Sequence, residues 1–149
     1  DGRLVVRGCS PAGDCGLYVM GANGGGERKI SSEFSDTAPA VSPDGSKIAV
    51  MSSARGATNW EIWVMNADGS SPQRLTNNGS NEGLPAWSSD GQSIAYVSDQ
   101  GGSWAVWVMN ADGSNQRKLF NMNGSPDGKV LRDIDNSKGW LEERISWAP

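Results

Sequence analysis

Short apolar segments recur along the whole chain, and residues that favour tight turns separate them. In the middle of the chain, Leu84–Ser88, Ser93–Ser98 and Trp104–Asn110 are apolar at most positions, and Asp90-Gly91 lies between the first two. The glycine of an Asp-Gly pair adopts the positive φ that a tight hairpin requires. Runs that are apolar at almost every position are typical of strands buried on both faces of a sheet. The pattern therefore predicts an all-β protein.

The same pattern returns at a regular interval. Val19-Met20, Val64-Met65 and Val108-Met109 are 45 and 44 residues apart. The string WVMNADGS occurs twice, at Trp63–Ser70 and Trp107–Ser114. A period in the mid-forties with several short strands in each repeat is typical of propeller blades. The sequence therefore predicts a repeat protein with three units.

Each unit contains four predicted strands, but the units are offset from the ends of the chain. The predicted strands are Thr37–Ser42, Gly83–Ser88 and Ile145–Pro149 (innermost); Arg3–Arg7, Lys47–Met51 and Ser93–Ser98 (second); Gly16–Met20, Glu61–Asn66 and Ala105–Asn110 (third); and Arg28–Ser31, Gln73–Thr76 and Arg117–Phe120 (outer). The first unit has no inner strand before it, and the spare inner strand lies at the C-terminal end. An insertion at about 121–144 separates the last outer strand from this spare strand.

The repeat resembles that of TolB-type β-propellers. In the third unit the resemblance is carried by Trp87-Ser88, Asp90-Gly91, Ile94-Ala95, Ser98-Asp99, Trp107 to Ser114, and Arg117 with Leu119. In the second unit Val41 stands where the pattern has an aromatic residue. Because rings of this family usually carry six blades, the resemblance implies that residues 1–149 form one domain of three four-stranded blades, which is half a ring. It does not specify a function, since such propellers serve many unrelated roles.

A half ring predicts assembly, because each of its two terminal blades leaves an apolar face uncovered. If such a face measures ~500 Å², its exposure costs up to about 12 kcal/mol, which rivals the stability of a typical domain. We expect the C-terminal strand, with Ile145 and Trp147, to add to the first strand of another copy. In that first strand, Leu4, Val5 and Val6 would accept it. A closed homodimer would complete six blades, and a contact that does not close would give a filament. A third alternative is that the chain is part of a longer polypeptide.

Composition excludes several functional classes. The net charge is −4 and the Lys and Arg residues are scattered, so no basic stripe indicates a nucleic-acid partner. No apolar run approaches 18 residues, so no membrane-spanning helix is predicted. The chain contains no His, which excludes Ser-His-Asp and Cys-His arrangements and His metal ligands. The sequence also shows no clear pair of facing carboxylates. For the aspartates of the Asp-Gly and ADGS turns, a structural role is the simplest interpretation. We therefore expect a protein without enzymatic activity.

The two cysteines lie close together in the string RGCSPAGDCG. Cys9 and Cys15 have five residues between them, which is enough for a disulfide to close a small turn. A disulfide would place the chain in an oxidising compartment, such as the periplasm, the cell surface or the extracellular medium. The alternative is two free thiols in a reducing compartment. A metal site is less favoured because the chain has no further Cys or His to complete it.

Two features of the sequence are candidate binding sites. In the string DIDNSKG, Asp133, Asp135 and Ser137 alternate as oxygen ligands do in calcium loops. However, Lys138 and Arg144 occupy the positions where an EF-hand has Gly and a bidentate Glu, so a polar loop closed by its own Asx turns is the simpler interpretation. The other candidates are three tryptophans outside the regular strand pattern, which are predicted to contact a ligand or a partner: Trp60, Trp104 and Trp140.

These observations lead to a functional prediction. The chain is expected to be a non-enzymatic, extracytoplasmic propeller that assembles with itself by exchange of terminal strands and serves as a scaffold for protein binding, with other envelope or surface proteins as further partners. Two alternatives stay open: a glycan-binding propeller that uses exposed aromatic side chains, and the lid of a larger hydrolase that contains a propeller. No cofactor is expected apart from the calcium alternative.

Overall fold

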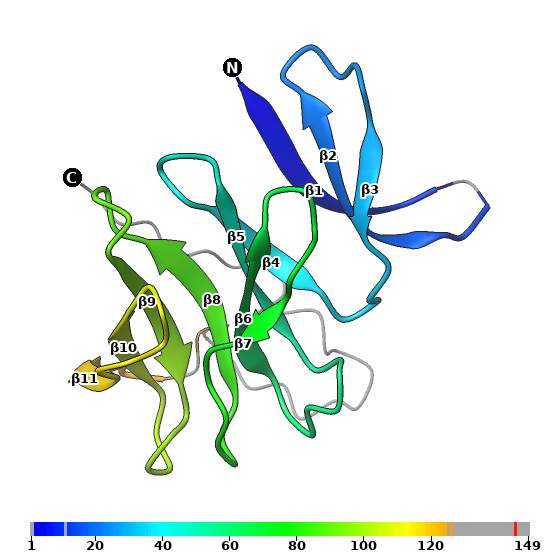
Figure 1. Cartoon of the computed structure of the whole chain (residues 1–149). Coiled ribbons are helices and arrows are strands. Elements are labelled where there is room, and N and C mark those ends of the chain that lie inside the picture. The colour runs from blue at the N-terminus through cyan, green and yellow to red at the C-terminus, as the bar shows by residue number, and fades with distance from the viewer. Residues whose placement is uncertain (1, 11, 125, 127–144, 146–149) are drawn as a thin grey trace.

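The computed structural model describes residues 2–10, 12–124, 126 and 145, which form three antiparallel sheets (Figure 1). The strands of each sheet follow one another in chain order, so neighbouring strands are joined as hairpins. The first sheet contains β1 (Arg3–Cys9), β2 (Cys15–Gly21) and β3 (Arg28–Ser31); the second contains β4 (Thr37–Val41), β5 (Lys47–Ser52), β6 (Glu61–Asn66) and β7 (Gln73–Arg74); the third contains β8 (Glu82–Trp87), β9 (Ser93–Ser98), β10 (Ala105–Asn110) and β11 (Arg117–Asn121).

The sheets lie side by side as the blades of a propeller, so the predicted all-β propeller fold is confirmed (Figure 1). The strand bounds agree closely with the predicted ones: β1 extends two residues further than predicted, and β7 ends two residues earlier. Leu75 and Thr76 leave the ladder because both backbone N–H groups donate to the Ile62 carbonyl, at 2.8 and 3.4 Å. Among the described residues the first sheet has three strands, and Ile145 of the predicted spare inner strand is outside any strand.

Apolar side chains fill both interfaces between neighbouring sheets. One cluster joins the first sheet to the second, and the other joins the second sheet to the third. The first cluster consists of Leu17, Val19, Ile30, Ile48, Val50, Trp63 and Met65. The second cluster contains Ala49, Met51, Ile62, Ile94, Tyr96 and Met109 among others, and Ile145 packs against it. Because β5 contributes to both clusters, its almost continuous apolar sequence is explained by burial on both faces.

The glycine of each ADGS turn fixes how a sheet docks on the preceding one. Gly69 has a φ of 88°, and a Cβ atom at this position would lie 1.8 Å from the Ile30 carbonyl oxygen. Gly113 has a φ of 87°, and its Cβ would lie 3.1 Å from the Leu75 carbonyl oxygen. The repeated turn therefore needs glycine both for its backbone conformation and for close approach to the outer strand of the preceding sheet.

Both four-stranded sheets have an irregularity at the same point of the inner strand. Ala38 and Leu84 have φ values of 49° and 53°, and the pairing register shifts beside each of them. Each is followed by a proline, Pro39 or Pro85, which has no N–H group to donate to a ladder. The resulting bulges turn the side chains of Ala38 and Leu84 into the second core cluster, where they are 2% and 3% exposed.

Candidate functional site

The inner edge of the first sheet is a candidate site for strand addition. Within the described residues β1 pairs with β2 and with no other strand, whereas its counterparts β5 and β9 each pair on both sides. The edge of β1 therefore presents N–H and C=O groups that a further strand could bind. This is the position at which the sequence predicts that a second copy adds its C-terminal strand.

The outer face of the same sheet is apolar and uncovered. Leu4 pairs with Met20 in the same register as Ile48 with Met65, and Val6 is the counterpart of Val50. Leu4 and Val6 are 49% and 36% exposed, whereas Ile48 and Val50 are 1% and 0% exposed. The same sequence pattern is therefore buried where a preceding blade covers it and exposed where none does. This contrast supports the predicted assembly strand.

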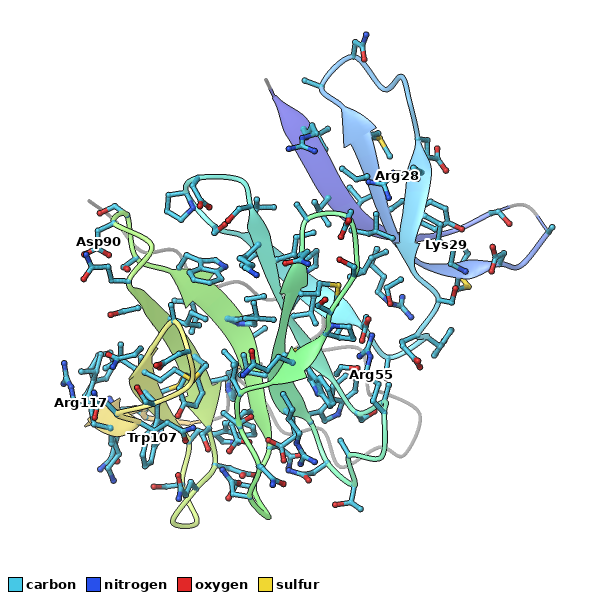
Figure 2. The ribbon with its side chains drawn as sticks, viewed as in Figure 1. Arg28, Lys29, Arg55, Asp90, Trp107 and Arg117 are labelled. Atoms are coloured by element: carbon cyan, nitrogen blue, oxygen red, sulfur yellow. A yellow bond between two sulfur atoms is a disulfide. The ribbon has the colours of Figure 1, made fainter. Side chains whose placement is uncertain are left out.

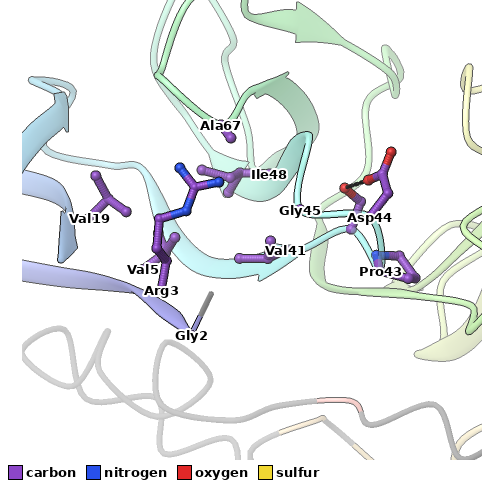
Figure 3. Close-up of a pocket in the computed structure, with 11 residues that line it drawn as sticks. Gly2, Arg3, Val5, Val19, Val41, Pro43, Asp44, Gly45, Ile48 and Ala67 are labelled. Carbon is purple, nitrogen blue, oxygen red and sulfur yellow. Dashed lines mark hydrogen bonds between the residues drawn. The ribbon is translucent and has the colours of Figure 1, made fainter. Parts of the chain in front are cut away.

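A cavity of about 490 Å³ lies between the first and second sheets, beside the open edge (Figure 3). Val5, Val19 and Ile48 provide apolar walls, and Val41 stands at the inner side. The Arg3 side chain extends into the cavity between Val19 and Ile48 (Figure 3). A related cavity of about 330 Å³ lies between the second and third sheets, and Trp87 is part of its lining.

A disulfide joins Cys9 to Cys15, as the sequence predicts. The two cysteines are directly opposite each other at the end of the ladder between β1 and β2. The bond holds β1 at the end that lies farthest from the cavity-lining Gly2 and Arg3. Because β1 has a neighbour on one side among the described residues, this covalent link contributes to keeping the candidate edge in place.

Removal of the disulfide should loosen the first sheet. A Cys9→Ser/Cys15→Ser variant is expected to lose about 2 kcal/mol of unfolding free energy, the value for a small closed loop. Urea denaturation with and without a reducing agent measures the loss. The reductant should lower the stability of the original chain and leave that of the variant unchanged. Equal stability of the two oxidised proteins would contradict the prediction.

A buried ion pair lies at the interface between the first and second sheets. Asp36, which precedes β4, is 0% exposed and receives two hydrogen bonds from the Arg55 guanidinium, at 2.8 and 2.6 Å. Ser31 of β3 donates to the same carboxylate at 2.5 Å. Figure 2 shows Arg55 in this contact region, and its guanidinium also lies 5.2 Å from the centroid of the Trp63 ring. The network connects an outer strand to the following inner strand.

The corresponding position of the next interface holds two neighbouring glutamates. Glu82 begins β8, is 0% exposed, and accepts a hydrogen bond from Ser98 Oγ at 2.8 Å. Glu61 of β6 is equally buried and is bound by Arg74 at 2.5 Å. Burial, and to a lesser extent the neighbouring Glu61 carboxylate, raises the pKa of Glu82 to about 7. Among the described residues the Oε2 atoms of both glutamates have no hydrogen-bond partner.

The turn aspartates have the structural role that the sequence indicates. Asp44 accepts hydrogen bonds from Ser42 Oγ at 2.6 Å and from the Ser46 backbone and side chain, and these bonds lower its pKa to about 2. Asp90 binds Ser88 Oγ and the Gln92 backbone in the same way, and its pKa is also lowered. These carboxylates stabilise turns because they accept hydrogen bonds from their own loops.

The structure describes two of the other predicted site residues. Trp60 and Trp104 are partly buried against the second core cluster, and their contact with a ligand or partner stays a prediction. Asp133, Asp135, Ser137, Trp140 and Trp147 lie outside the described residues. Within the described part of the chain, no group of three or more Cys, Asp or Glu side chains is placed to hold a metal ion.

The sequence did not indicate the two buried acidic networks. It showed no facing carboxylates, yet the structure brings Glu61 and Glu82 together from different units. A usable signal was the repeated acidic residue three positions before proline, as in Asp36 to Pro39 and Glu82 to Pro85.

In the described part of the chain, no helix is long and apolar enough to cross a lipid bilayer.

Comparison with known proteins gives the family. The family model described as TolB beta propeller domain matches residues 14–146. Over 53 residues the chain is 49% identical to the Tol-Pal system protein TolB of Desulfosudis oleivorans, covering 36% of this chain and 12% of that protein. Over 70 residues it is 43% identical to dipeptidyl-peptidase 5 of Porphyromonas gingivalis (strain ATCC 33277), covering 43% of this chain and 10% of that protein.

A solved TolB structure shows the same architecture. The TolB protein of Agrobacterium tumefaciens is similar with a TM-score of 0.70 and 27% identity, over 80% of this chain and 46% of that chain. The chain thus spans less than half the length of that structure, and it matches about a tenth of the two sequence relatives. With the family match over 14–146, these findings show that the chain belongs to the TolB beta-propeller domain family.

Proposed function

We propose that this chain is a non-enzymatic propeller scaffold that assembles with itself by adding the Ile145–Pro149 strand of one copy to β1 of another. The observation that carries the proposal is the combination of an open β1 edge with an uncovered apolar face at Leu4 and Val6. Two half rings joined in this way would complete six blades and bury both features. The Cys9–Cys15 disulfide supports a location outside the cytoplasm.

The repeat suggests the register of the added strand. In the second sheet Ala40 pairs with Ala49 and Val41 with Ile48, and the third sheet has the same pairs at Ala86 and Trp87. The counterparts of Ala49 and Ile48 in the first sheet are Val5 and Leu4. Ser146 and Trp147 of the second copy would therefore lie opposite Val5 and Leu4, respectively.

Light scattering after size-exclusion chromatography tests the assembly. The intact chain is expected at about twice 15.8 kDa for a closed dimer, and a Leu4→Lys/Val6→Lys variant is expected at the mass of one chain, because two charges on this strand oppose edge pairing. Gln100→Lys, which adds the same charge at an exposed turn, is the control and should keep the assembled mass. A folded intact chain that elutes at 15.8 kDa would falsify the proposal.

One comparison favours a second candidate function. The 43% identity to dipeptidyl-peptidase 5 over 70 residues supports the alternative that the chain is part of the propeller of a larger peptidase. The sequence that follows residue 149 in the gene distinguishes the two candidates. A peptidase domain there would favour the second, since the remaining blades would then belong to the same polypeptide.

A further inference from the structure

The cavities at the two sheet interfaces are repeats of each other. Both are lined by the Asp-Gly turn of the following sheet, by the alanine of its ADGS turn and by a valine from the preceding sheet. In chain order these are Asp44, Ala67 and Val19 at the first interface, and Asp90, Ala111 and Val64 at the second. One interface can therefore serve as an internal reference for the other.

The two cavities differ in the last residue of the inner strand that lines each of them. At the second interface Trp87 contributes its indole ring to the lining, and its Nε1 donates to the Ala40 carbonyl at 3.0 Å. At the first interface the equivalent residue is Val41, which is 42% exposed. The cavity beside Val41 is the larger one, at about 490 Å³ against about 330 Å³. The fold thus has a place for an indole ring that its own sequence leaves unfilled.

The two cavities also differ in how their equivalent cations are bound. Arg3 extends into the cavity at the first interface (Figure 3). The corresponding residue at the second interface is Lys47, which also lines its cavity but whose ammonium group donates to Asn66 Oδ1 at 2.7 Å. The Arg3 guanidinium has no hydrogen bond or ion pair with the part of the chain that is described. Asp44 does not compete with a ligand for Arg3, because both of its carboxylate oxygens accept hydrogen bonds within the turn.

We infer that the cavity between the first and second sheets binds a small planar aromatic carboxylate of about the size of an indole derivative. Its ring would lie among Val5, Val19, Val41 and Ile48, in the space that Trp87 occupies one repeat later. Its carboxylate would accept charge-assisted hydrogen bonds from Arg3. The inference does not rest on the proposed assembly, because one chain supplies the whole lining.

Calorimetric titration with indole-3-propionate and with neutral indole tests this inference. The chain is expected to bind one molecule of either probe. Arg3→Gln should weaken binding of the carboxylate about tenfold, equivalent to about 1.4 kcal/mol, and should leave the affinity for indole unchanged. Val41→Trp should abolish binding of both, since it restores the side chain that the repeat has at this position.

A matched variant at the second interface serves as the control. Trp87→Val opens the equivalent cavity, where the cation Lys47 is already bound to Asn66. It should therefore leave the carboxylate site unchanged and add a weaker site for neutral indole. Absence of saturable binding at about 5 mM probe, or binding that Val41→Trp leaves intact, would overturn the inference. If Val41→Trp does not fold, Arg3→Gln decides, because it changes an exposed side chain: equal affinity of both proteins for indole-3-propionate refutes the site.

Discussion

Replacement of Arg55 by methionine is expected to lower the unfolding free energy by about 3–5 kcal/mol. The change would leave the Asp36 carboxylate buried with Ser31 as its one side-chain partner among the described residues. The loss would not arise from the backbone, although Arg55 has a φ of 57°, because methionine has the same Cβ constraint at this position. Urea denaturation near pH 7 measures the effect.

Two comparisons separate this effect from a general loss of charge. In the pair Lys29–Asp14 the carboxylate side chain is 63% exposed, against 0% for Asp36, so Lys29→Met should cost less than about 1 kcal/mol. A double variant, Arg55→Met/Asp36→Leu, should recover much of the loss because no unpaired buried charge remains. If Arg55→Met costs no more than Lys29→Met, the Asp36–Arg55 pair does not stabilise the interface between the first and second sheets.

The repeat made the strands of this chain predictable. Turn glycines and apolar strands such as Lys47–Met51 occupy the same positions in each repeat. Three copies therefore specify each strand boundary more firmly than one copy would. Two departures from the predicted bounds have local causes. The ladder between β1 and β2 extends to Cys9 and Cys15, where the disulfide lies, and β7 ends early because Leu75 and Thr76 both donate to Ile62.

The contacts between repeats were less predictable, because they join positions of one unit to non-equivalent positions of the next. Asp36 and Glu82 each lie three residues before the proline of an inner strand. Asp36 binds an arginine from the loop after β5, whereas Glu82 lies beside a glutamate of β6. The residue that corresponds to Glu61 in the first unit is Gly16. Sequence periodicity places the acidic residues but cannot give their partners, since the partners do not repeat.

The candidate site was only partly visible in the sequence. Leu4, Val5 and Val6 were predicted as assembly residues because each terminal blade of a half ring leaves an apolar face uncovered. Of these, Leu4 and Val6 are exposed in the structure. The importance of Val41 was harder to see. Its departure from the aromatic pattern was apparent, but the cavity that results depends on the docking of two sheets and on the path of the Arg3 side chain.

The stability of the chain is expected to fall as the pH rises from about 4.5 to about 7, and Glu82 is the cause. In the folded chain this carboxyl keeps its proton up to about pH 7, whereas in the unfolded chain it loses the proton near the ordinary glutamate pKa of 4.5. The unfolded state therefore binds fewer protons in this window, so the contribution is fully present below about 4.5 and is lost as the pH rises. The two values imply a loss of about 3 kcal/mol.

The charged groups around Glu82 agree with this direction. Glu61 lies beside it and opposes its ionisation, and the one nearby cation, among the side chains described, is Arg74, which already binds Glu61. Asp99 is bound by Asn81, next to Glu82 in the chain, and adds negative charge to the same region. No described contact therefore favours the charged form except the hydrogen bonds from Ser98 and Asn78.

Glu82→Gln keeps the shape of the protonated side chain and removes the titration. It should have nearly the stability of the original chain at about pH 4.5 and exceed it by about 3 kcal/mol at about pH 8, as measured by urea denaturation across that range. Glu27→Gln, an exposed substitution of the same kind, should leave the pH profile unchanged. Parallel profiles for the original chain and Glu82→Gln would show that the Glu82 carboxyl is not protonated at the interface between the second and third blades. In that case the interface would have to hold the ionised Glu82 carboxylate beside Glu61, with Arg74 bound to Glu61, which low-dielectric surroundings strongly disfavour.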